Sequence, residues 1–148
     1  MENRKCIAVL TEKPSLDYQS GILKGIYRSA FSHDVNVAVF CVTSTRSDEA
    51  YQIGEMVIFS LLGDYSSFSG VIYLPDTIDY SMRDTLITEK LIAASRKIKI
   101  PVVTIDGNYD EFPCFLSDDS EPIQFLVEHL SVGHGCKDIA CVSGRKNP

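Results

Sequence analysis

The sequence predicts an α/β fold in which a doubly wound parallel sheet lies between two layers of helices. Short apolar runs rich in Val and Ile alternate with amphipathic segments along the 148 residues, which is the rhythm of strand–helix–strand units. The apolar runs are nearly continuous, as expected for strands buried on both faces of a sheet. Because parallel crossovers are right-handed, few topologies remain. We expect a flavodoxin-like lobe of strand order 2-1-3-4-5 in three α/β/α layers.

The expected strands are short runs of apolar and β-branched residues. The first, KCIAVLT, is nearly continuous, and Pro101 fits because it opens its strand, where no ladder hydrogen bond is required of it. The strands are expected over residues 5–11, 35–42, 70–74, 101–105, 115–117 and 137–143.

Four helices are expected, over residues 19–31, 48–62, 80–97 and 121–132. The first and third carry apolar residues at helical spacing. The second opens with Asp48 and Glu49, whose charges suit a helix N-terminus. Gly133 follows the last helix and can take the left-handed conformation that ends it, while His134 can bond the free carbonyls there.

Composition excludes several classes of protein. The chain has 14 Lys and Arg against 20 Asp and Glu, a formal charge of −6. Without a basic cluster, we expect no contact with nucleic acid and no binding to a membrane surface. No apolar run approaches the roughly 18 residues of a membrane span, and the N-terminus lacks a signal-peptide cleavage site. The expected location is the cytoplasm.

The five cysteines are odd in number and form no C-x-x-C pair. This pattern favours reduced thiols over a disulfide framework. A zinc site formed by Cys136, Cys141 and His134 is conceivable, although the spacing matches no usual set of zinc ligands. We expect neither a metal nor a cofactor.

Polar side chains follow the strands at the edge where an open parallel sheet binds ligands, beyond the carboxyl ends. Together with Tyr18 and Tyr109 they favour a polar small molecule such as a sugar, whose hydroxyls donate to carboxylates and whose apolar face covers an aromatic ring. The same residue types also cap helices, so each one alone has a structural interpretation. The polar residues are Thr11, Glu12, Lys13, Ser15, Asp17, Thr43, Ser44, Thr45, Arg46, Asp76, Thr77, Asp79, Asp106, Asn108, Asp118, Asp119 and Ser120.

The signatures of common enzyme classes are missing. No G-x-G-x-x-G turn follows the first strand, no Walker A sequence is present, and residues 142–144 form only half of a G-x-S-x-G elbow. A phosphoacceptor receiver domain would need an acidic pair after the first strand, which Thr11 and Glu12 only half provide, although Asp76 would suit the phosphorylated position. We expect no catalytic residue.

Four stretches resemble one family in their order and spacing. IAVLTEKPSLDYQSGILKGI (residues 7–26) resembles the opening of the type I periplasmic-binding-protein fold, in its lac-repressor-like regulator branch. SGVIYLPD (69–76) and IPVVTIDG (100–107) are similar to the third and fourth strands of that family. Leu16 and Asp17 depart from the family's Asn and Pro, and Gly107 stands where Arg is usual.

The most specific part of the resemblance is LSDDSEPIQFLVEHLSVGHGCKDIACVSG (116–144). It is similar to the family pattern V-x-x-D-N…A-x-x-H-L-x-x-x-G-H-x-x-I-A-x-I-x-G, with Pro122 where a small residue is common. The matching residues are Asp118, His129, Leu130, Gly133, His134, Ile139, Ala140 and Gly144.

The resemblance implies a ligand-sensing lobe of a bacterial transcriptional regulator or signalling protein. Residues 1–133 would form the N-terminal lobe, and residues 134–148 the crossover and first strand of a second lobe. A small polar ligand would bind between the lobes, with Ser15 and Tyr18 as the first expected contacts and Asp76 and Asp118 as the next. This chain would carry no DNA-binding domain. Its output module would lie downstream, for example a diguanylate cyclase or a kinase.

Two other functions stay open. A flavodoxin-like or nucleotide-binding enzyme could use Asp76, Asp106 and Asp118 around Mg²⁺. An interaction domain would work only through dimerisation. We also expect a homodimer, because residues 56–62 (MVIFSLL) are apolar nearly all round and a helix on one sheet face needs only one apolar stripe.

Overall fold

The computed structural model describes residues 4–42, 65–75, 78, 82–107 and 109–142. The chain divides into two compact units, Met1–Leu116 and Ser117–Pro148, and each is described by itself. This division falls earlier than the lobe boundary expected after Gly133, and that boundary stays a prediction. The expected helix 48–62, with the apolar segment 56–62, lies outside the described residues.

The first unit contains a five-stranded, all-parallel sheet of order β2-β1-β3-β4-β5, which confirms the predicted topology. β1 is central because it pairs with β2 on one side and with β3 on the other. At Val9, for example, the partners are Val39 and Ile72. The strands are β1 (Cys6–Glu12), β2 (Asn36–Val42), β3 (Gly70–Tyr73), β4 (Val102–Ile105) and β5 (Cys114–Phe115).

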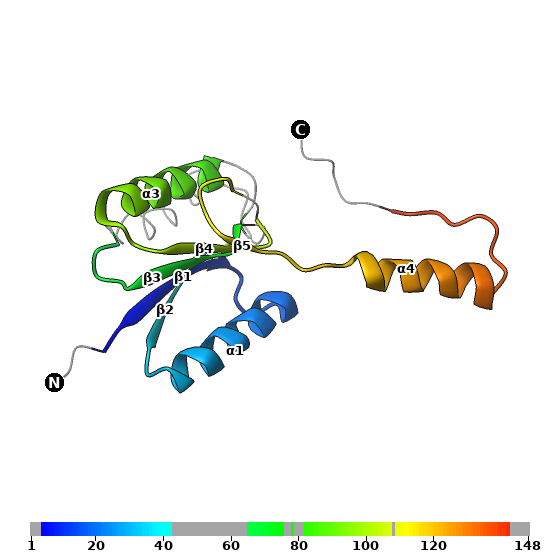
Figure 1. Ribbon diagram of the computed structural model, residues 1–148, viewed down its shortest axis with the longest axis horizontal. Coiled ribbons are helices and arrows are strands. Elements are labelled where there is room, and N and C mark those ends of the chain that lie inside the picture. Colours follow the sequence, from blue (N-terminus) through cyan, green and yellow to red (C-terminus); the bar gives the residue numbers. More distant parts are fainter. Residues whose placement is uncertain (1–3, 43–64, 76–77, 79–81, 108, 143–148) are drawn as a thin grey trace. The chain divides into compact units, whose positions relative to one another are not determined.

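Helices α1 (Asp17–Ser32) and α3 (Met82–Ile98) cover opposite faces of this sheet (Figure 1). Side chains alternate across β1, so Ala8 and Leu10 pack on the α3 face while Val9 packs on the α1 face. All three are fully buried, and burying a side chain the size of Val9 or Leu10 contributes about 1.5–3 kcal/mol. The near-continuous apolar run of β1 is therefore a consequence of helices on both sides.

The second unit consists of helix α4 (Ser120–Glu128), which continues into a π-helical turn, η2 (His129–Gly133). Gly133 was expected to end the helix in a left-handed conformation, and this prediction is wrong. Gly135 takes that conformation, with φ 67°. The backbone N–H of Cys136 then donates to the Leu130 carbonyl at 3.0 Å. The wider π turn displaces the stop toward the C-terminus.

The strand expected over residues 137–143 does not form over 137–142, the part that the structure describes. A strand is stable only when its backbone groups pair with a neighbouring strand. No strand of the described chain pairs with this segment. The apolar run alone therefore does not determine a strand, because a strand also needs a neighbour with which to pair.

Among the described helices, none is long and apolar enough to cross a membrane.

Tyr65 is a buried polar residue that the sequence did not single out. Its side chain is fully buried in the core on the α3 face, and in the described part of the chain its hydroxyl has no hydrogen-bond partner. Burial raises the pKa of Tyr65 to about 12, because the ionised phenolate is poorly solvated there. The neutral hydroxyl also lacks compensation for its lost hydration.

We predict that Tyr65→Phe leaves the free energy of unfolding unchanged or raises it at pH 7. In the wild type, the folded pKa lies above the unfolded value near 10, so stability falls as the pH rises from about 10 to about 12, by up to about 2–3 kcal/mol. Tyr65→Phe should remove that part of the alkaline loss. Urea unfolding at pH 7 and across pH 9–12 measures both effects, and an unchanged alkaline profile would contradict the prediction.

Candidate functional site

The carboxyl edge of the sheet begins with the last residue of β1. Glu12 is 3% exposed, and its Oε1 lies 2.8 Å from Nζ of the neighbouring Lys13. A buried carboxylate is costly unless it is paired, and Lys13 supplies the opposite charge from a more exposed position. Thr11, directly before this pair, is also buried. The carboxyl end of β1 is therefore polar and buried, whereas the part of the strand before it is apolar.

The backbone leaves β1 and β4 in an unusual conformation. Lys13 and Asp106 directly follow these strands, and both are non-glycine residues in the left-handed region, with φ 42° and 57°. Asp34 and Lys99 share this conformation, but they follow the ends of α1 and α3, where left-handed residues commonly end helices. Strained residues at the ends of strands are characteristic of binding sites. The two at this edge are thus further signs of a site.

A side-chain hydrogen bond joins the exits of β1 and β4. The Tyr18 hydroxyl, in the first turn of α1, donates to Oδ2 of Asp106. The backbone N–H of Asp106 donates in turn to the Phe115 carbonyl at 2.9 Å, which ties it to β5. Tyr18 is 48% exposed. Its hydroxyl is oriented by Asp106 while much of its ring remains available to a ligand.

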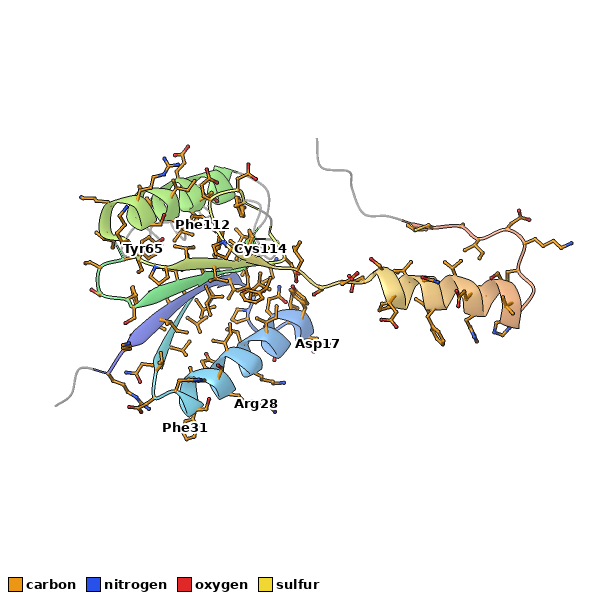
Figure 2. The ribbon with its side chains drawn as sticks, in the orientation of Figure 1. Asp17, Arg28, Phe31, Tyr65, Phe112 and Cys114 are labelled. Atoms are coloured by element: carbon orange, nitrogen blue, oxygen red, sulfur yellow. The ribbon has the colours of Figure 1, made fainter. Side chains whose placement is uncertain are left out.

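Ser15 lies beside this pair in the turn between β1 and α1. Its side chain is exposed, and the turn is closed by the Leu16 N–H, which donates to the Lys13 carbonyl at 3.1 Å. Asp17 opens α1 at the same end of the helix (Figure 2). The structure thus brings Ser15 and Tyr18 to one short loop at the carboxyl edge. Whether they contact a ligand stays a prediction.

Tyr109, the second tyrosine expected to face a ligand, packs into the core instead. Its ring stacks on Tyr73 at 6.1 Å between centroids and also contacts Phe112 at 6.4 Å. All three belong to the cluster on the α3 face. Of the two tyrosines, Tyr18 is therefore the one whose ring is largely exposed at this edge.

Neither of the two predicted aspartates belongs to the described residues of the first unit. Asp76 lies outside them. Asp118 lies in the second unit, where its Oδ1 accepts the Ser120 backbone N–H at 3.0 Å at the start of α4. Hydrogen bonds from the side chain and backbone of Ser120 lower the pKa of Asp118. This carboxylate therefore accepts the N–H of the first residue of α4, and its role as a ligand contact stays a prediction.

Gly107 stands where the family that the sequence resembles usually has Arg, and its surroundings account for the glycine. Its backbone runs against the Pro75 ring at the exit of β3, and a Cβ at Gly107 would overlap that ring. Thr104 is fully buried and its hydroxyl donates to the Gly107 carbonyl at 2.7 Å. The exits of β3 and β4 are thus held together at a point where any side chain, arginine included, lacks room.

We predict that Gly107→Ala lowers the free energy of unfolding by about 1–3 kcal/mol, the usual cost of overpacking. The displaced turn should also shift Asp106 away from Tyr18, which NMR shifts of the Tyr18 ring would report. Gly21→Ala is the matched control, since nothing lies within 4 Å of a Cβ there and alanine is the better helix former. Equal loss of stability in both variants would contradict the argument.

The described residues contain no group of three or more His, Cys, Asp or Glu side chains able to hold a metal ion. The zinc site conceived from Cys136, Cys141 and His134 is therefore wrong. All five cysteines are free, as expected. The proposed Mg²⁺ set is not tested as a whole, because it includes Asp76.

An apolar groove of about 370 Å³ lies at the other end of α1. It runs between the helix and the sheet, from Gly25 to His33 on α1 and past Ile7 at the start of β1. Apart from Ser29 and His33 its lining is apolar, in contrast to the carboxyl edge. This apolar groove and the polar carboxyl edge are thus distinct features of the first unit.

No family model and no curated protein matches this sequence. The fold, however, is that of the lac-repressor-like regulators of the periplasmic-binding-protein type, the fold that the sequence resemblance predicted.

Three solved structures illustrate the likeness. The lac repressor dimer bound to operator and the anti-inducer ONPF aligns with a TM-score of 0.61 over 88% of this chain, at 19% identity. A LacI transcriptional regulator from Rhodococcus gives 0.59 over 86%, at 18% identity. The LacI family regulator CCPA from Weissella paramesenteroides, with bound glucose, gives 0.56 over 85%, at 19% identity. This chain spans 41% of the length of each of them.

Proposed function

We propose that this chain is the ligand-sensing lobe of a bacterial cytoplasmic regulator, and that it binds a small polar metabolite against a second lobe. A separate output module would read the state of the sensor. Ligand binding would act by shifting the population of open and closed arrangements. The chain itself would catalyse no reaction.

The hydrogen bond between Tyr18 and Asp106 carries this proposal. It lies at the carboxyl ends of β1 and β4, where doubly wound sheets bind their ligands, and it places a carboxylate beside an exposed aromatic ring. Carboxylates accept hydrogen bonds from hydroxyl groups, and an aromatic ring covers the C–H face of a sugar. The site therefore suits a polyol better than an apolar ligand.

The structural neighbours support the same class of ligand. One CCPA structure from Weissella paramesenteroides contains glucose and another contains sucrose. For this chain we propose a sugar-like ligand, with Ser15 and Tyr18 as contacts and Asp76 and Asp118 as further candidates. No cofactor enters the proposal.

We predict that this chain alone binds such ligands no tighter than roughly 0.1–1 mM, because a two-lobe clamp divides its contacts while the entropy cost of binding stays. Titrations with glucose, sucrose and a panel of nucleosides, followed by NMR, should shift the amides of Ser15 and Tyr18. Tyr18→Ala should abolish those shifts. Tyr27→Ala, at an equally exposed tyrosine farther along α1, should retain them.

Two outcomes would contradict this prediction. Micromolar binding by this chain would show that the site is complete within one lobe. Ligand-induced shifts confined to Gly25 and Ile26 would place the ligand in the apolar groove.

We propose in addition that the regulator is a homodimer whose contact includes the C-terminal end of α1. Phe31 is 83% exposed there and points outward (Figure 2), and it lines a second hollow of about 290 Å³ with Tyr27 and Val37. Adjoining apolar groups on a surface favour association. The sequence argument for a dimer rested on segment 56–62, which lies outside the described residues.

We predict that Phe31→Ser weakens self-association by at least about tenfold, since losing the burial of one aromatic ring corresponds to more than 1.4 kcal/mol. Sedimentation equilibrium at tens of micromolar measures the change. Arg28→Ser, at an exposed position of the same helix, is the control. A strictly monomeric wild type would refute the dimer.

A further inference from the structure

Two histidines of the second unit meet at the end of α4. Nε2 of His129 lies 3.0 Å from Nε2 of His134. The ring centroids are 4.7 Å apart, with the planes at 78°. His129 is the first residue of η2 and His134 directly follows its last residue.

The π turn is what brings these residues together. In an α-helix, 3.6 residues complete a turn, so positions five apart lie well around the axis from each other. In a π turn the hydrogen bonds span five residues, and positions five apart therefore lie over one another. The left-handed Gly135 and the bond from Cys136 to Leu130 close this turn. The π turn therefore accounts for the contact between the two histidines.

The His129 ring is in contact with a second ring of the same helix. Phe125, one turn earlier on α4, stacks on it at 6.4 Å between centroids and 18° between planes. Gly133 lies next to Nδ1 of His129, where a Cβ would make an ordinary van der Waals contact at 3.6 Å. One member of the pair is thus oriented before any ligand arrives.

The geometry of the nitrogens selects a class of ligand. Imidazole nitrogens bind metals at about 2.0–2.1 Å, and two nitrogens 3.0 Å apart would then subtend roughly 90–97° at a shared ion. That angle belongs to adjacent positions of an octahedron or a square plane, which Ni²⁺ and Cu²⁺ prefer.

We propose that His129 and His134 form a two-imidazole site for a divalent late transition-metal ion, Ni²⁺ or Cu²⁺, with water completing the coordination. Without metal, one neutral ring donates its Nε2–H to the Nε2 of the other. With metal, both rings carry the proton on Nδ1, and both Nε2 lone pairs bind the ion. The ion therefore replaces the shared proton and fixes the end of α4.

The test is a calorimetric titration of the reduced 148-residue chain with NiCl₂ at pH 7.5, since Ni²⁺ does not oxidise the free cysteines as Cu²⁺ would. We expect one ion per chain, undisturbed by excess Mg²⁺. His129→Gln and His134→Gln should each weaken binding by about tenfold or more. Binding should weaken in acid, because protonated imidazole is no ligand. His33→Gln is the control, since its ring lies in the other unit, on the Ser29 carbonyl.

Three results would overturn the proposal. The first is no Ni²⁺ binding up to millimolar concentration. The second is binding that Cys136→Ser abolishes while both histidine variants retain it. The third concerns the wild type and needs no variant: Ni²⁺ should broaden the ring protons of His129 and His134 together in NMR spectra, and broadening of other residues alone would place the ion elsewhere.

Discussion

The rest of the first unit depends on the position of β1, which is hydrogen-bonded along both edges and covered on both faces. Its seven residues pair with all of β2, and four of them pair with β3. Every side chain between Ala8 and Leu10 must therefore be apolar, and none is exposed. The first place where the strand can carry charge is its carboxyl end. The Glu12–Lys13 pair and the turn to Tyr18 follow from that constraint.

The topology could be predicted from sequence because buried parallel strands leave a strong local signal. The run CIAVL is apolar on both faces and VNVAVFCV is nearly so, and the spacing leaves room for one helix in each of the first three connections between strands. Predicted and observed strand limits differ by one or two residues at most of their ends, where a strand end is defined by pairing with its neighbour. The prediction of a last strand over residues 137–143 was wrong for the same reason. An apolar run does not show whether a neighbouring strand is there to pair with it.

The candidate site could be predicted only in part. Polar residues after each strand pointed to the carboxyl edge, where the Tyr18–Asp106 hydrogen bond lies, and Tyr18 was among them. Its link to Asp106 joins positions 88 apart in sequence, and no local pattern encodes such a pair. Tyr109 looked equivalent in sequence, yet it packs on Tyr73 because the loop after β4 folds back over the α3 face. Gly107 departs from the family pattern because of the Pro75 ring, which lies just after β3 and is distant in sequence.

Helix α1 connects the two ends of the first unit that carry proposed roles. It begins beside the Tyr18–Asp106 hydrogen bond and ends at the exposed Phe31. Its 16 residues span about 24 Å at 1.5 Å per residue, and Leu23 and Ala30 fix it to the sheet along one side. A packed helix moves as a rigid element, because close-packed side chains resist continuous deformation. A ligand that replaced Asp106 as the partner of Tyr18 would therefore act at the N-terminal end of α1. The C-terminal end of the same rigid helix lies in the proposed dimer contact. In this arrangement, the sensing of a ligand and the geometry of the dimer would be coupled by a single element.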